Sequence, residues 1–266
     1  MTRISRSRRL LLGLAVAVGL VPSPLAQRVT ASAESVTLAE QYLLSAANQE
    51  RAARGLSILH RNPQLAYAAA RHAQEMAAHG TISHQFAGEP ELTERGASAG
   101  VPFSEISENV GEAPSVVQIH NMWMNSEHHR TNLLDPAVDS AGISVMVRNG
   151  ELYAVEDFAR TVRAVSLDQQ ESAIASLLAR QASISIGDQP EVVSAARKTC
   201  SMSTGYAGTR KPYFVMRFTS DSLNQIPEQL KSKVASGRYR EAAVGACPRT
   251  ERSAFTSYNF AVLLYP

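Results

Sequence analysis

A tight turn between two runs of strand-forming residues is the feature that most restricts how this chain folds. The segment reads AGISVMVRNGELYAVEDFA and covers residues 141–159. Asn149–Gly150 is a pair that two-residue hairpin turns favour, because both residues reach positive φ at low cost. The segment therefore predicts an antiparallel hairpin near the end of the first 160 residues.

Helical patterns come before this hairpin. Apolar residues recur at helical spacing from Ser35 to Arg54, and the pattern stops at Gly55. A second helix is expected with Asn62 as its N-cap, Pro63 at its first position and Gly80 at its end. Helices followed by a hairpin predict an α+β domain.

The region between the second helix and the hairpin is more polar. Residues 88–100 predict a short helix, and residues 103–115 predict a polar loop that carries Glu105, Glu108 and Glu112. Residues 114–126 predict another helix. Its residues expected to face inward are Val116, Ile119, Met122 and Trp123.

The first 33 residues have the pattern of an export signal. Arginines precede an apolar run from Leu10 to Leu20, and small residues follow it. The run is too short to span a bilayer comfortably, so we expect cleavage after Ala26 or Ala33 and no membrane anchor afterwards. General secretion and twin-arginine export both stay open. The expected location is outside the cytoplasm, either extracellular or periplasmic.

Charge divides the rest of the chain into two parts. Residues 34–160 hold 8 arginines, no lysine and 16 acidic residues, a net charge of −8. Residues 161–266 hold 13 basic and 8 acidic residues, a net charge of +5. The full-chain charge of +2 depends on five arginines in the signal and gives no reason to expect nucleic-acid binding. We expect two domains, residues 34–162 and residues 163–266.

The second part contains both cysteines and none of the seven histidines. Cys200 and Cys247 fit a structural disulfide in an exported protein. By restricting the unfolded chain, this bridge would stabilise the fold by about 4 kcal/mol. Helices are expected over 166–181, 189–201 and 226–237, and strands over 211–220, 240–248 and 256–266. These predict a small α+β domain without an internal repeat. Its basic surplus has two open interpretations: docking on the acidic part, or contact with an anionic envelope.

Five segments of the first part, in order, resemble the CAP superfamily of cysteine-rich secretory proteins, antigen 5 allergens and pathogenesis-related proteins. They are LLSAANQERAARGLSILHRNPQLAYAAARHAQEMAAHGTISH, SENVG, WMNSEHHRTNLL, AGISV and LYAVEDFA, within residues 38–160. The style of the third segment is that of the bacterial secreted branch. The resemblance implies an α-β-α sandwich with a cleft, followed here by the smaller α+β domain.

The resemblance also implies a site. In the family, two histidines face each other across the cleft and glutamates join them. His84 matches the first histidine, Glu108 matches the glutamate of the family's EN motif, and His129 matches the second histidine because it directly precedes Arg130. His128 stands where the family usually has glycine. A further family glutamate is replaced here by Ser126.

Three uses of His84, Glu108 and His129 stay open. Two imidazoles and a carboxylate are an ordinary ligand set for zinc with a fourth position for water. The same groups suit general acid–base catalysis, which makes them the catalytic candidates as well. They also suit a polar cleft that only holds loops in place.

The function we expect is that of an exported CAP-domain module that binds a lipid, an envelope component or a protein. The alternative is a metal-dependent hydrolase acting on peptide or cell-wall substrates. Because no HExxH motif or marked nucleophile is present, the sequence favours the binding module over an enzyme. Several other polar residues are expected to be structural: His72 in the core, and Asn48, Arg51, Asn109, Arg130 and Asn132 on loop backbone.

Overall fold

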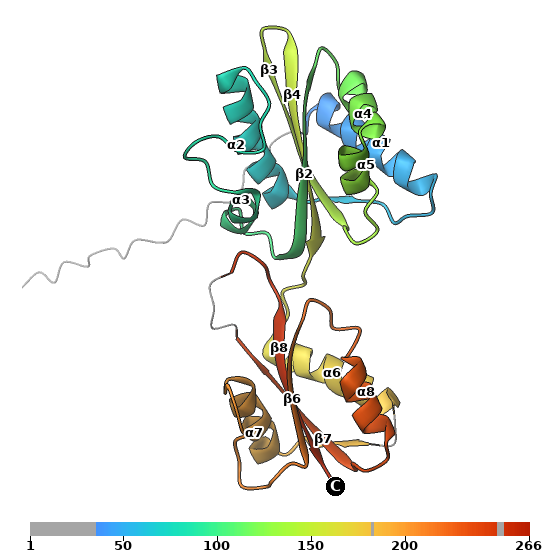
Figure 1. Cartoon of the computed structure of the whole chain (residues 1–266), viewed down its shortest axis with the longest axis vertical. Coiled ribbons are helices and arrows are strands. Elements are labelled where there is room, and N and C mark those ends of the chain that lie inside the picture. Colours follow the sequence, from blue (N-terminus) through green and yellow to red (C-terminus); the bar gives the residue numbers. More distant parts are fainter. Residues whose placement is uncertain (1–35, 182–183, 249–252) are drawn as a thin grey trace, which may run out of the picture. The chain divides into compact units, whose positions relative to one another are not determined.

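The computed structural model describes residues 36–181, 184–248 and 253–266 (Figure 1). The predicted export signal and both predicted cleavage sites lie outside these ranges. No helix within them is long and apolar enough to cross a membrane. Helices and strands alternate in a mixed α+β fold, as the sequence predicts.

The first sheet has four strands in the order β1-β3-β4-β2. The short strand β1 runs parallel to β3, and the other neighbours are antiparallel. The predicted hairpin is confirmed, since Asn149 and Gly150 have φ values of 52° and 86°. The strands are β1 (His60–Arg61), β2 (Phe103–Ala113), β3 (Ser140–Arg148) and β4 (Glu151–Thr161).

Helices cover both faces of this sheet, with α2 and α3 on one face and α1, α4 and α5 on the other (Figure 1). The predicted limits of α2 are confirmed, because Asn62 caps its start and Gly80 ends it in the left-handed conformation. The helices are α1 (Leu38–Ala52), α2 (Pro63–His79), α3 (Leu92–Ser98), α4 (Val116–Asn125) and α5 (Glu127–Leu133). The result is an α-β-α sandwich.

Two local predictions are wrong. Residues 103–113 form strand β2, not a polar loop, and pair with β4 along its length. The strand was missed because its polar residues Glu108 and Asn109 suggested an exposed loop. Both are in fact buried against side chains from other elements. Met122 does not face inward and is 51% exposed, while Trp123 is buried and donates its indole N–H to the Val110 carbonyl oxygen.

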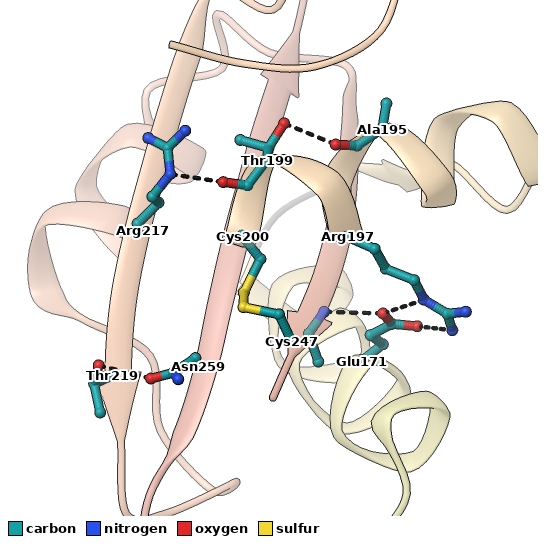
Figure 2. Close-up of a disulfide and its surroundings, with 10 residues drawn as sticks. Glu171, Ala195, Arg197, Thr199, Cys200, Arg217, Thr219, Cys247 and Asn259 are labelled. Atoms are coloured by element: carbon teal, nitrogen blue, oxygen red, sulfur yellow. Dashed lines mark hydrogen bonds and ion pairs between the residues drawn. A yellow bond between two sulfur atoms is a disulfide. The ribbon is translucent and has the colours of Figure 1, made fainter. Parts of the chain in front are cut away.

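The second sheet also has four strands, in the order β5-β7-β8-β6. Helix α7 covers one face, and α6 and α8 cover the other (Figure 1). All the helices and strands expected here are confirmed. The elements are α6 (Leu167–Gln181), β5 (Ser185–Ile186), α7 (Pro190–Cys200), β6 (Phe214–Ser220), α8 (Glu228–Ala235), β7 (Glu241–Cys247) and β8 (Tyr258–Tyr265). The predicted disulfide joins Cys200 to Cys247, at the end of α7 and the end of β7 (Figure 2).

The second sheet repeats the topology of the first. In both, the strands lie in the order first, third, fourth and second, and a two-residue first strand runs parallel to the third. Both third strands also contain a glycine on which a helix backbone rests: a Cβ added to Gly142 or to Gly245 would lie 2.2 Å from a backbone atom of α2 or α7. No internal repeat is visible in the sequence, so this similarity is one of architecture. The predicted domain limits, 34–162 and 163–266, stay predictions.

Candidate functional site

Glu108 lies at the centre of the candidate site. It stands on β2, on the face that α2 and α3 cover, and only 6% of the residue is exposed. One carboxylate oxygen accepts a hydrogen bond from His84 Nδ1 at 2.9 Å, and the other accepts from the guanidinium group of Arg95. Both oxygens of this buried carboxylate are therefore engaged.

Arg95 supplies the charge that allows Glu108 to be buried. Its side chain is 4% exposed and comes from α3. Besides Glu108, its Nη1 donates to the carbonyl oxygens of His84 and Pro90, at 3.2 and 3.3 Å. Arg95 thus neutralises the carboxylate and holds the loop that carries His84. The sequence analysis missed this residue, because nothing in its local spacing distinguishes it from a surface arginine.

His84 and His129 differ in exposure and in charge. The His84 side chain is 63% exposed, and its hydrogen bond to Glu108 raises its pKa. His129 is half-buried on α5, and burial lowers its pKa first, followed by the positive charges of His84 and His128. His129 therefore lies within electrostatic reach of His84, while its neighbour His128 is exposed.

Two asparagines fix α5 against β2. Asn109 donates its amide to the His129 carbonyl oxygen at 3.0 Å. Asn132 donates to the Glu108 carbonyl oxygen at 3.2 Å and to Asn109 Oδ1 at 3.0 Å. Two adjacent residues therefore hold both histidine-bearing segments. The Glu108 carboxylate binds the His84 ring, and the Asn109 amide binds the backbone of His129. Ser126 stands at the junction of α4 and α5.

The three candidate site residues do not all meet at one point. Among the described residues, no group of three or more histidine, cysteine, aspartate or glutamate side chains is arranged to hold a metal ion. His84 and Glu108 are in contact, and each Glu108 oxygen already accepts one hydrogen bond. This leaves the two imidazoles as the better candidates for protein ligands.

The comparisons with known proteins concern the first part of the chain. The sequence model of the family described as "Cysteine-rich secretory protein family" (CAP) matches residues 44–158. Residues 44–158 form a CAP domain. The family predicted from the sequence is therefore confirmed for this part of the chain, which contains His84, Glu108 and His129.

Three of the similar proteins come from bacteria. The Bacillus subtilis protein YkwD, described as uncharacterized, is 26% identical over 125 residues, which are 47% of this chain and 48% of YkwD. The chain therefore matches about half the length of this curated relative. An extracellular protein with an SCP domain from Bacillus anthracis is 27% identical with a TM-score of 0.42, and the match covers 46% of this chain and 40% of that one. A cysteine-rich secretory protein from Staphylococcus aureus is 26% identical with a TM-score of 0.40. That match covers 49% of this chain and 41% of the other.

Two buried acids of the CAP domain were also missed from sequence. Asp157 on β4 is directly opposite Glu108, and its pKa is raised well above the ordinary value by burial and then by the negative charge of Glu108. Glu156 is fully buried, and burial raises its pKa to about 8 against the opposing effect of Arg51. The available signal was a pair of adjacent acids in the apolar strand YAVEDFA.

An open groove of about 650 Å³ lies on the CAP domain, and His84, Glu108 and His129 are not among its lining residues. Its lining starts at Ile82, two residues before His84, and includes Asn125 at the end of α4. Apolar, amide and acidic side chains share the lining, which is formed by Ile82, Glu112, Ala113, Pro114, Gln118, Asn121, Met122, Asn125 and Glu151. No basic side chain is among these residues.

The residues expected to be structural have that role in the CAP domain. The ring nitrogens of His72 lie 2.7 Å from the Glu89 carboxylate and from the Ser83 carbonyl oxygen. Arg51 donates to four backbone carbonyl oxygens. Asn48 bonds the backbone of Leu59, and Arg130 donates to the Met124 carbonyl oxygen.

Proposed function

We propose that this chain is exported and that its CAP domain is a ligand-binding module rather than an enzyme. The observation that carries the proposal is the double engagement of Glu108 by Arg95 and His84. A hydrolase needs a base that can take a proton from water, and a carboxylate with both oxygens engaged is poorly suited to that role. The alternative, a metal-dependent hydrolase, therefore loses its best candidate base.

We further propose that His84 and His129 take up one divalent metal ion such as zinc. The carboxylate of Glu108 holds Nδ1 of His84 and leaves Nε2 as the free ring nitrogen of an exposed imidazole. A carboxylate behind a histidine orients the ring and raises its basicity towards a metal. Glu108 thus acts as the outer partner and not as a ligand. A bound ion would supply a positive charge that polarises an oxygen atom of the ligand.

The lining of the groove supports a polar ligand. Gln118, Asn121 and Asn125 offer amide donors and acceptors, and Glu112 and Glu151 offer negative charge beside Ile82 and Met122. Amides satisfy the hydroxyl and amide groups of sugars and peptides. We infer that an envelope component or a protein segment suits this groove better than a lipid chain does.

Export has its own support. Two observations support it: the signal pattern of residues 1–33 and the Cys200–Cys247 disulfide. Disulfides persist mainly in oxidising compartments outside the cytoplasm.

Native mass spectrometry of the protein recovered from the medium or periplasm tests the proposal. We expect a chain that starts near Gln27 or Glu34 and takes up one zinc ion, which EDTA removes. The double variant His84→Ala/His129→Ala should take up none. A secreted wild-type protein that binds no zinc, or a double variant that still binds one ion, would contradict the metal assignment. A chain that keeps its first 33 residues and stays in the cytoplasm would contradict export.

A further inference from the structure

The repeated topology allows the two sheets to be compared position by position. In the first sheet, Gly142 on β3 pairs with Asp157 on β4, which pairs with Glu108 on β2. Gly142 is the glycine on which the backbone of α2 rests. It therefore marks one row across the sheet, and Glu108 occupies the β2 position of that row.

The second sheet has the same row. Gly245 on β7, on which the backbone of α7 rests, pairs with Ala261 on β8, and Ala261 pairs with Arg217 on β6. Arg217 thus stands where the first sheet has Glu108. The equivalent position therefore carries a guanidinium group in the second sheet and a histidine-binding carboxylate in the first.

Arg217 also holds a loop. Its Nε donates to the Thr199 carbonyl oxygen at 2.7 Å (Figure 2), and its Nη2 donates to the Gly205 carbonyl oxygen. Thr199 Oγ1 accepts from the backbone N–H of Ala207 at 2.9 Å. The disulfide at Cys200 ties the start of the same segment to β7. Residues 201–213, here called the 201–213 loop, follow α7 as the His84 segment follows α2.

The 201–213 loop exposes aromatic and apolar side chains. Tyr213 is 70% exposed, and Met202 and Tyr206 are also exposed. Arg210 in the same loop is fixed by an ion pair with Glu241 at 2.6 Å and by stacking over the Tyr265 ring. Because the loop is held by these contacts, its apolar side chains stay exposed and are available to a partner surface.

Two lysines give this surface its charge. Lys198 on α7 and Lys211 in the loop are exposed and make no ion pair with any described residue. Arg217 adds a third positive charge. Its hydrogen bonds go to the backbone carbonyl oxygens of Thr199 and Gly205, so they do not neutralise that charge. The CAP part carries a net charge of −8, so attraction to anions is a local property of the second part and not of the whole chain.

We propose that the 201–213 loop docks on an anionic lipid surface. Tyrosine places its ring at the boundary between headgroups and acyl chains, while lysine keeps its ammonium group among the phosphates. Each lysine near such a surface strengthens binding by about fivefold. The ligand is thus the headgroup phosphate layer of a bilayer, with the tyrosines and Met202 covered by it.

Co-sedimentation of the signal-free chain with phosphatidylcholine vesicles, with and without phosphatidylglycerol, tests this proposal. The buffer contains EDTA, so the result does not depend on the zinc site. We expect binding only to the anionic vesicles. The double variant Lys198→Gln/Lys211→Gln should bind roughly 25-fold more weakly, and Tyr213→Ser should also lose affinity, with Tyr213→Phe restoring most of it.

The matched control is Lys233→Gln, which removes a lysine from α8 on the other face of the sheet (Figure 1). It should bind as the wild type does. Equal binding to both kinds of vesicle, or an equal loss in the Lys233 variant, would overturn the proposal. Competition by inorganic phosphate that removes all binding would also overturn it, because the loop would then recognise free phosphate and not a surface.

Discussion

Glu108 and Asp157 bring two carboxyl groups together on neighbouring strands, where water does not reach them. The Arg95 guanidinium group lies against Glu108, and His84 takes the other oxygen. Two adjacent carboxylates cannot both be ionised cheaply at low dielectric. Burial first, and then the negative charge of Glu108, raises the pKa of Asp157.

Glu156 provides the clearest pH effect on stability. Its pKa is about 8 in the folded protein, against an ordinary value of 4.5. The folded state therefore holds a proton that the unfolded state releases, so this stabilisation is complete below 4.5 and is lost as pH rises towards 8. Glu156→Gln should equal the wild type at about pH 5 and be more stable by several degrees in Tm at about pH 9.

Thermal unfolding across this pH range checks the prediction. The control is Glu105→Gln, which changes an exposed glutamate. The control should unfold as the wild type does at every pH. A Glu156→Gln protein whose stability falls with pH as steeply as that of the wild type would contradict a protonated Glu156.

At the residue level, the sequence predicted the parts of the site that lie in motifs. His84, Glu108, Asn109 and His129 belong to the segments that resemble the family. Arg95 lies outside these segments, and its contact with Glu108 depends on where α3 lies. Asp157 lies within one of them, but its place opposite Glu108 depends on the strand register, which neither segment shows alone.

At the level of elements, the helices were easier to predict than strand β2. Caps are local, so the predicted cap Asn62 and the predicted stop Gly80 mark α2 in the sequence as they do in the structure. Strand β2 has polar residues on both faces, and its partners come from distant elements. Its pairing with β4 decides its conformation, and pairing cannot be read from the strand alone.

Gly142 decides how closely α2 approaches β3. A Cβ at this position would lie 2.2 Å from the carbonyl carbon of Leu65 and 2.3 Å from the backbone nitrogen of Ala66. Since backbone atoms cannot move aside without shifting the helix, Gly142→Ala should destabilise the protein by about 3 kcal/mol or more. Ser144→Ala, two residues along the same strand, should cost about 1 kcal/mol or less. Urea unfolding of both variants measures the difference, and a wild-type midpoint for Gly142→Ala would show that the helix lies further away.

At the level of the whole chain, one topology is used twice with different chemistry. The row marked by Gly142 carries Glu108, and the row marked by Gly245 carries Arg217. The sequence predicted three helices and three strands of the second part, but neither the short strand β5 nor the repeat. Topology depends on which positions are apolar and where glycine allows a close approach, and many sequences without mutual similarity meet those conditions.

All seven histidines belong to the first part, so any histidine-bound metal belongs to the CAP domain. The adjacent pair His128 and His129 provides a matched comparison within that domain. His129 is half-buried and responds to the charge of His84, whereas His128 is exposed. A metal ion held by the two cleft histidines should therefore depend on His84 and His129 and be indifferent to His128.

Calorimetric titration of zinc into the signal-free protein and its three single alanine variants tests the proposed site most directly. At about pH 7.5, where an unperturbed imidazole is neutral, the wild type should bind one ion with modest affinity. His84→Ala and His129→Ala should each lose at least about tenfold in affinity, and His128→Ala should bind as the wild type does. No zinc uptake by the wild type, or a loss confined to His128→Ala, would contradict the assignment of the site.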